Sequence, residues 1–415
     1  MRISLPAAGR PTEDLLAEMR AMKSGDADWQ GGKVPLYVFK AEDSVTEIGK
    51  AAFFEYFSEN ALGAGRAFPS VKRMEDDVVA MALGLFNAPD GGRGFMSTGG
   101  TESIVLAVQA CRDWSRKQRG DAGHRGNLVA SETVHPAFNK GAKLMDLDVR
   151  RAPVGPDLRM DLAAVEALID DNTIMLVGSA PNFPYGMIDP IAALGEIATR
   201  RGLWLHVDAC VGGYLAPFVR MIGRPIPDFD FVVPGVSSLS ADLHKFGFCP
   251  KPASTEFYRD ADKAQHHIFD ADVWPNGRFV TTTIVGTRPA GGAAGAWAVL
   301  NHLGVDGFKR IATNLMRFID AYKDGIRATP GLHIHGAPDL SIVAYGSDEF
   351  DIFRVAVVMG AKGWLPGLVQ RPKGIHRMMS MFHAPVLDQY LDDMRAAIGV
   401  VRQEAPTEAK IKANY

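Results

Sequence analysis

A lysine in surroundings that favour a reactive amine is the first residue of the chain that could do chemistry. Lys245 follows His244 in a run of mostly small and apolar residues, 236–251, with glycine and proline close behind. In a dry pocket a lysine loses the solvation of its ammonium form, so we expect its pKa to fall and its amine to become nucleophilic. Such an amine can hold an aldehyde cofactor as a Schiff base. An ordinary lysine in a surface loop explains this run equally well, and three other segments decide between the two interpretations.

A phosphate site is indicated by residues 94–103, where a short strand, a double-glycine turn and the start of a helix follow one another. The free backbone N–H groups at a helix start and the helix dipole both favour an anion. Gly100 lets the backbone come close to a ligand, and Thr101 adds a hydroxyl donor. The segment is not a Walker A loop, because no lysine follows the second glycine. A plain helix cap is the alternative when the segment is taken alone.

Two more side chains follow predicted strands. His135 lies at the carboxyl end of a strand, where open α/β sheets bind their ligands, and its imidazole could stack on an aromatic cofactor ring. Asp208 ends a buried strand, where an unpaired carboxylate would be costly. A pyridinium N–H is a natural partner for it, because a fixed anion keeps that nitrogen protonated and the ring can then act as an electron sink. A structural histidine and a turn-capping aspartate are the alternatives.

The order of these residues is more specific than any one of them. Each candidate follows a predicted strand, in the order Gly100 and Thr101, His135, Asp208 and Lys245. Together they would provide a phosphate site, a ring-stacking imidazole, an acid for a ring nitrogen and a lysine. This combination predicts an enzyme that uses pyridoxal 5′-phosphate (PLP).

Strands and helices alternate over residues 90–290, which predicts an α/β fold with a mainly parallel central sheet and helices on both faces. We expect three parts: an N-terminal arm (1–55), a large PLP-binding domain (56–290) and a small C-terminal α+β domain (291–415). In the arm, residues 11–23 have the spacing of an amphipathic helix and are expected to pack on a neighbour or a partner subunit.

The small domain is expected to contain helices over residues 307–328 and 385–404 and strands over 340–345 and 353–359, followed by a loose tail from residue 405. Its local basic cluster, Arg371, Lys373, His376 and Arg377, could attract an anionic substrate group, although a solvated turn and strand edge is the favoured interpretation.

Composition excludes several classes of protein. The 415 residues carry a net charge of −3 and 47% hydrophobic residues, so we expect a globular protein that does not bind nucleic acid. Three cysteines without a CxxC pair argue against a disulfide framework and a metal site. Neither a signal peptide nor a run of about 18 apolar residues is present, so no membrane anchor and a cytoplasmic location are expected.

The chain resembles a known family in several motifs. It is similar to the sphingosine-1-phosphate lyase branch of the group II pyridoxal-dependent decarboxylase superfamily, which has the aspartate-aminotransferase (fold type I, PLP-dependent transferase-like) fold. The resemblance covers residues 60–385. The matching segments are STGGTES (97–103), VHPAFNK (134–140), GSAPNFPYG (178–186), HVDACVGG (206–213), SLSADLHKFG (238–247), IVGTRP (284–289), AWA (296–298) and GWL (363–365).

The resemblance implies a role for each matching residue. It implies that Lys245 binds the cofactor covalently, that Asp208 binds the ring nitrogen and that His135 stacks on the ring. The residues that it assigns to cofactor binding besides these are Gly100, Thr101, His244 and Ser240. Gly286 and Thr287 match a phosphate contact donated by the partner subunit, which implies a homodimer with a shared active site.

Two residues are weaker catalytic candidates. Lys251 matches a second lysine that the family keeps close to the substrate, and Tyr185 could move protons, although a packed loop aromatic is the simpler interpretation of it. Two positions depart from the family pattern: residues 60–63 read Asn-Ala-Leu-Gly instead of Asn-Pro-Leu-His, and Pro252 replaces a glycine.

Three functions remain open. The first is a carbon–carbon lyase that cleaves a phosphorylated long-chain amino alcohol into an aldehyde and phosphoethanolamine by a retro-aldol reaction. The second is an L-amino-acid decarboxylase, which would use the same residues with a group that binds the substrate carboxylate. The third is a PLP-binding protein without turnover, against which the intact Lys245 and Asp208 argue.

Overall fold

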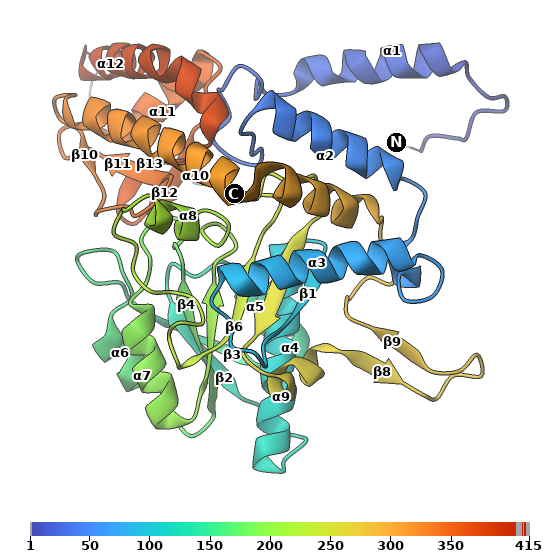
Figure 1. Ribbon diagram of the computed structural model, residues 1–415. Coiled ribbons are helices and arrows are strands. Elements are labelled where there is room, and N and C mark those ends of the chain that lie inside the picture. Colours follow the sequence, from blue (N-terminus) through green and yellow to red (C-terminus); the bar gives the residue numbers. More distant parts are fainter. Residues whose placement is uncertain (1, 404–408, 410, 412–415) are drawn as a thin grey trace.

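A seven-stranded sheet forms the centre of the computed structural model, which describes residues 2–403, 409 and 411 (Figure 1). Its strand order is β1-β7-β6-β5-β4-β2-β3. The strands are β1 (Arg93–Ser97), β2 (Asn127–Ser131), β3 (Asp148–Ala152), β4 (Thr173–Ser179), β5 (Trp204–Asp208), β6 (Val236–Ala241) and β7 (Ser254–Tyr258). Strands β2 to β6 pair in parallel, whereas β7 runs antiparallel to both β1 and β6. The predicted mainly parallel sheet is confirmed.

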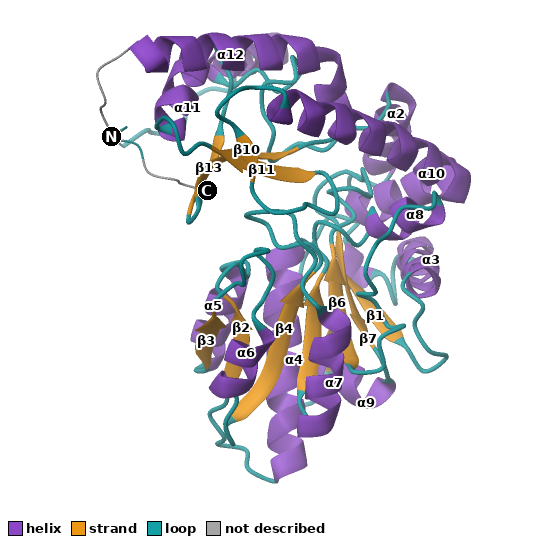
Figure 2. Cartoon of the chain, turned by 90° about the vertical axis from the view of Figure 1, so that its left-hand side faces the viewer, coloured by secondary structure: helices purple, strands orange, loops and turns teal. Residues whose placement is uncertain are grey.

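Helices cover both faces of this sheet (Figure 2). Alternate residues of β5 show why: Leu205 and Val207 pack in the cluster that contains α7, whereas Trp204 packs with Ile104 and Val108 of α4. A buried parallel strand has to be apolar on both sides, which is how these strands read in the sequence. The helices of this part are α3 (Pro69–Leu85), α4 (Gly100–Arg119), α5 (Ala137–Met145), α6 (Leu162–Leu168), α7 (Ile191–Arg201), α8 (Ala216–Met221) and α9 (Ala261–Ala264).

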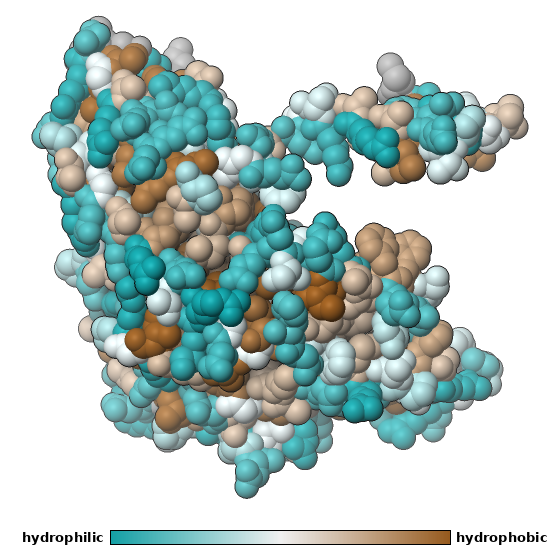
Figure 3. Space-filling model, turned by 45° about the horizontal axis from the view of Figure 1, so that its top comes forward, coloured by the Kyte–Doolittle hydropathy of each residue, from teal (hydrophilic) through white to brown (hydrophobic). Residues whose placement is uncertain are grey.

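The first part of the N-terminal arm, as far as helix α1, stands away from the body of the chain (Figures 1 and 3). Helix α1 (Thr12–Met22) has the predicted amphipathic spacing, but none of its residues is buried. Leu15, Leu16 and Met19 are all exposed. Helix α2 (Asp43–Glu55) follows and packs on α10.

A second exposed element is the hairpin of β8 (Phe269–Ala271) and β9 (Phe279–Thr281), which projects beside β1 in Figure 1.

Helix α10 (Gly291–Arg327) joins the two ends of the molecule. It packs on α2, α3 and α8 and reaches β10 of the small domain. The helix predicted over 307–328 is therefore its second half, and the two halves meet at Gly304, whose φ of 53° is not helical. The small sheet has the order β10-β11-β13-β12. Its elements are β10 (His333–Ile334), β11 (Ile342–Gly346), α11 (Ile352–Ala361), β12 (Gly367–Gln370), β13 (Lys373–Met378) and α12 (Leu387–Gln403).

The strand predicted over 353–359 is wrong, because this segment is helix α11. Its β-branched residues favour a strand locally, but Phe353, Val355, Ala356 and Met359 are buried together on the helix. The side chain of Asp351 caps the first turn by accepting the N–H of Phe353. Tertiary packing and the cap together outweigh the local preference.

Three expectations concern the end of the chain, the bilayer and metal ions. The loose tail expected from residue 405 lies outside the described residues except for 409 and 411. Within the described part of the chain, no helix has both the length and the apolar character that crossing a bilayer requires. No cluster of three or more possible metal ligands is found among the same residues.

Candidate functional site

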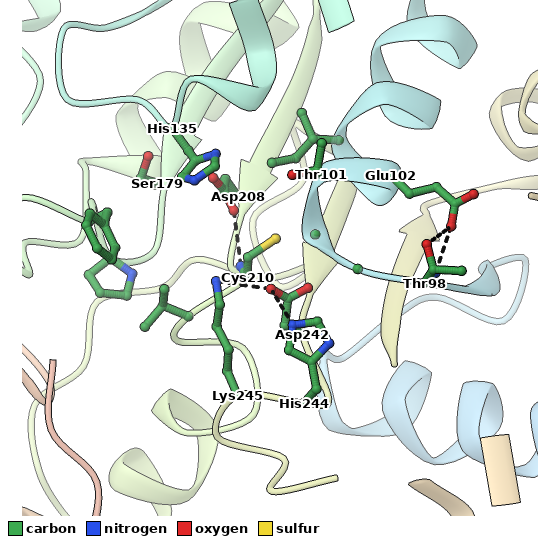
Figure 4. A pocket seen from close by; sticks show the side chains of 16 residues that line it. Thr98, Thr101, Glu102, His135, Ser179, Asp208, Cys210, Asp242, His244 and Lys245 are labelled. Atoms are coloured by element: carbon green, nitrogen blue, oxygen red, sulfur yellow. Dashed lines mark hydrogen bonds and ion pairs between the residues drawn. The ribbon is translucent and has the colours of Figure 1, made fainter. Parts of the chain in front are cut away.

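A cavity of about 410 Å³ lies where the parallel strands of the large sheet end (Figure 4). Parallel strands bring their carboxyl ends to one edge, so side chains that follow different strands meet there. The residues on its wall are Thr98, Gly99, Gly100, Thr101, Glu102, Ile104, His135, Ser179, Pro181, Phe183, Asp208, Cys210, Val211, Asp242, His244 and Lys245. The structure thus brings together six of the predicted residues: Gly100, Thr101, His135, Asp208, His244 and Lys245.

The start of α4 forms one end of the cavity. A Cβ atom at Gly100 would lie 2.8 Å from both the Sγ of Cys210 and an oxygen of Asp242, so this position requires glycine. Glu102 ties the helix start to its surroundings. One of its oxygens accepts hydrogen bonds from the N–H and hydroxyl of Thr98, and the other accepts the N–H groups of Ile284 and Val285.

His135 and Asp208 lie next to each other on the wall of the cavity (Figure 4). The Nδ1 atom of His135 accepts the N–H of Ala137 at 3.2 Å, which leaves the proton of a neutral ring on Nε2. Burial lowers the pKa of His135 against the opposing effect of Asp208, so the ring is neutral at neutral pH and suited to stacking. The Oδ1 atom of Asp208 accepts the N–H of Cys210 at 3.1 Å.

Lys245 has a carboxylate partner that the sequence analysis missed. Its Nζ atom lies 3.0 Å from Oδ2 of Asp242, which is buried. Burial alone would lower the pKa of Lys245, but Asp242, with smaller contributions from Cys210 and Asp208, raises it above the usual lysine range. The predicted fall of this pKa is therefore wrong for the free amine. An acid three residues before the lysine, in the same turn, was the available signal.

His244 lies between Asp242 and Gly99. Its Nδ1 atom accepts the N–H of Ala253 at 3.3 Å, so a neutral ring carries its proton on Nε2, which is 3.7 Å from Oδ2 of Asp242. Burial lowers the pKa of His244. A Cβ atom at Gly99 would be 3.6 Å from this ring, which places His244 beside the start of α4.

The other predicted residues lie outside the wall of this cavity. Ser240 is fully buried in β6, where its hydroxyl contacts Nε2 of His206 at 3.2 Å and Sγ of Cys210 at 3.4 Å. Lys251 donates a hydrogen bond to the carbonyl of Tyr37 at 2.8 Å.

Thr287 accepts a hydrogen bond from the side chain of Asn60 at 3.2 Å, and its neighbour Gly286 lies close to Leu62. Tyr185 donates its hydroxyl to the carbonyl of Arg371, as a packed loop aromatic would.

A second cavity, of about 680 Å³, shares His135 and Phe183 with the first. Besides these two, half of its wall residues are apolar (Val134, Pro136, Pro153 and Pro184) and half are polar or charged (Glu132, Thr133, Arg151 and Arg371). Arg371 is the member of the predicted basic cluster that reaches a cavity.

The rest of the cluster is engaged elsewhere. Lys373 pairs with Asp351, His376 contacts the carbonyl of Pro184, and the guanidinium of buried Arg377 lies 3.8 Å from the ring centre of Tyr390.

A buried acid lies behind Asp208. Across β5, β6 and β7, Asp208 is paired with Ser240 and Ser240 with Glu256, so the three side chains share a face of the sheet. Glu256 has no exposed surface, and within the described residues neither of its carboxyl oxygens has a hydrogen-bond partner. Its Oε1 atom is 3.8 Å from Nδ1 of His206, whose pKa burial lowers to about 4. Burial, with a contribution from Asp208, raises the pKa of Glu256 far above its usual range.

Known proteins resemble this chain along nearly its whole length. Residues 60–347 match the family model of the pyridoxal-dependent decarboxylase conserved domain. A sphingosine-1-phosphate lyase of rice (Oryza sativa subsp. japonica) is 38% identical over 97% of this chain and 75% of its own, and one of Arabidopsis thaliana is 40% identical over 96% and 74%. A solved sphingosine-1-phosphate lyase of Burkholderia pseudomallei superposes with a TM-score of 0.92 at 35% identity, covering 97% of this chain and 94% of that one.

Replacing Glu256 should stabilise the protein in a pH-dependent way. The folded state keeps a proton on Glu256 that the unfolded chain releases near the usual glutamate pKa, so this residue costs stability as the pH rises above that value. We expect Glu256→Met to raise the free energy of unfolding by about 2 kcal/mol near pH 8 and by less near pH 5. Urea denaturation at the two pH values measures this difference.

The matched control is Glu256→Gln, which removes the titration but keeps polar atoms without partners. It should lose the pH dependence without the full gain in stability. An equal gain for Glu256→Met at both pH values would contradict a neutral Glu256.

Proposed function

Because the chain belongs to the pyridoxal-dependent decarboxylase family, we propose that it is a PLP-dependent lyase that cleaves a phosphorylated long-chain amino alcohol into an aldehyde and phosphoethanolamine. The observation that carries this proposal is the meeting of Lys245, Asp208 and His135 on one cavity wall. The relatives that are named sphingosine-1-phosphate lyases support the substrate class.

The residues of the cavity fit PLP. The start of α4, with the glycine required at position 100, suits the phosphate, and Nε2 of His244 adds a donor. Asp208 keeps lone pairs for a ring N–H beyond the one bond to Cys210. The neutral ring of His135 suits an aromatic face, and Lys245 provides the amine for the aldehyde carbon. Bound PLP supplies an electron sink for the bond that is broken.

The protein side of the reaction follows from charges in the cavity. The carboxyl group of Asp208 would hold the ring nitrogen of bound PLP, and the imidazole of His135 would support a face of its ring. The amine of Lys245, when it is not bound to the cofactor, would favour its protonated form because Asp242 lies 3.0 Å away. After taking up a proton, Lys245 could donate it to the carbon that becomes the amine product.

The second cavity suits the apolar chain of such a substrate. It shares the wall residues His135 and Phe183 with the first cavity, and its wall includes Val134, Pro136, Pro153 and Pro184. Burial of apolar surface there would stabilise a long alkyl chain in proportion to its length. Arg371 at the same wall is an exposed cation.

We further propose a homodimer with a shared active site. The exposed apolar residues of α1 and of the β8–β9 hairpin, among them Val273 and Trp274, support a covering partner. Gly286 and Thr287 are absent from the cavity wall of their own chain, which suits a contribution to the partner's site. A cytoplasmic location is proposed because Cys111, Cys210 and Cys249 are all free thiols.

Lys245 should carry the cofactor. After borohydride reduction of the PLP-loaded protein, we expect peptide mapping to find the reduced cofactor on Lys245. The variant Lys245→Ala should lose that adduct and at least about 10³-fold in kcat, because both the attachment point and the proton donor are removed. Lys251→Ala is the matched control and should keep the adduct on Lys245. An adduct on a different lysine of the wild-type protein would refute the assignment.

The products should identify the reaction. With a phosphorylated long-chain amino alcohol as substrate, the aldehyde and phosphoethanolamine should form in equal amounts, measured by mass spectrometry. Release of carbon dioxide from L-amino acids, without aldehyde from the amino alcohol, would instead establish the decarboxylase. If neither substrate class changes the absorption of the bound cofactor, the protein binds PLP without turnover.

Mixed dimers test the shared site. Lys245→Ala and Gly286→Asp should each be inactive alone, the second because it places an anion beside the cofactor phosphate. Mixing and reassociating them should restore about a quarter of wild-type activity, because half of the dimers contain one intact site. Each variant reassociated with itself is the control. No recovery, with mixed dimers present in native mass spectrometry, would show that Gly286 serves its own chain.

A further inference from the structure

Asp242 lies at the place where the proposed function puts the cofactor phosphate. Both of its carboxyl oxygens are within 2.9 Å of the position that a Cβ atom of Gly100 would take, so the carboxylate touches the first turn of α4. A helix start attracts anions, and here the anion is part of the chain itself. Within the described residues, Oδ1 of Asp242 is buried and has no hydrogen-bond partner.

The other oxygen of Asp242 has two basic neighbours. Oδ2 is 3.0 Å from Nζ of Lys245 and 3.7 Å from Nε2 of His244. Burial would raise the pKa of Asp242, but Lys245 and His244 outweigh it and lower the pKa below its usual value. Asp242 is therefore an anion in a cavity that also has to accept a phosphate. The titratable groups that face it are Lys245, His244, His135, Cys210 and Tyr214.

The carboxylate of Asp242 and a cofactor phosphate would repel each other if both were bound by His244 and the start of α4. Nε2 of His244 carries one proton, which can be donated to Asp242 or to a phosphate but not fully to both. The first turn of α4 is likewise in contact with Asp242. We propose that Asp242 is an internal counter-ion that competes with the cofactor phosphate for His244 and the start of α4, and that it also holds Lys245 in place before the cofactor attaches. This inference rests on the proposed PLP site.

The competition has a consequence for loading of the enzyme. The carboxylate keeps the proton on Lys245, whereas attack on an aldehyde needs the neutral amine. Asp242 thus opposes both the binding of the phosphate and the covalent step. It acts through Lys245 and His244, so it is a positioning residue.

Cofactor-free protein provides the test, with inorganic phosphate as the probe. We expect Asp242→Asn to bind phosphate at least about tenfold more tightly than the wild type in isothermal titration calorimetry, because a like charge is removed. Asp242→Glu, which keeps the charge, is the matched control and should show no such gain. Near- and far-ultraviolet circular dichroism verifies that both variants are folded.

A second measurement reports the protonation of Lys245 directly. The rate at which acetic anhydride labels Lys245, followed by peptide mapping over a pH series, should reach half of its maximum at a lower pH in Asp242→Asn, because the carboxylate that holds the proton is gone. Unchanged or weaker phosphate binding in folded Asp242→Asn, or an unchanged labelling midpoint, would overturn the proposal. Both readouts use protein without PLP, so they remain distinct from the borohydride test of the proposed function.

Discussion

A charge inside a dry cavity needs an opposite charge or a hydrogen bond, and this constraint organises the whole site. Lys245 is only partly exposed and yet remains an ammonium group, because Asp242 lies 3.0 Å away. His135 meets the same constraint by staying neutral and accepting a backbone N–H. Asp208 meets it in part through the N–H of Cys210 and keeps the rest of its hydrogen-bonding capacity for the cavity. The architecture serves this arrangement, since the parallel strands bring all of these groups to one edge of the sheet.

The sequence predicted the members of the site because their order along the chain carries the geometry. Gly100, His135, Asp208 and Lys245 each follow a strand, and parallel strands end at the same edge. No knowledge of distances was needed. The sequence failed where a distance decides: it predicted a lowered pKa for Lys245 from the apolar character of the segment. Only the fold shows that Asp242, three residues earlier, returns to face the amine.

The surroundings of individual side chains were the other feature that could not be predicted from the sequence. Ser240 belongs to the motif around the lysine and shares a face of the sheet with Asp208, but its side chain is fully buried against His206 and Cys210 and does not reach the cavity wall. A motif does not state whether a side chain reaches a cavity or packs against its neighbours within the sheet, which only the fold shows. The same limit explains the segment 353–359, where β-branched residues suggested a strand and burial against the small sheet made a helix.

Asp242 and Glu256 show how the site keeps its charges apart. Both are buried acids close to the cofactor cavity, but only Asp242 has a cation within hydrogen-bonding distance. The nearest basic atom to Glu256 belongs to His206, which is itself neutral because burial lowers its pKa to about 4. Asp242 is therefore an anion, whereas Glu256 keeps its proton and adds no charge behind Asp208. A second anion there would compete with Asp208 for a positively charged ring, so the neutrality of Glu256 leaves Asp208 as the acid on this face of the sheet that can hold the ring nitrogen.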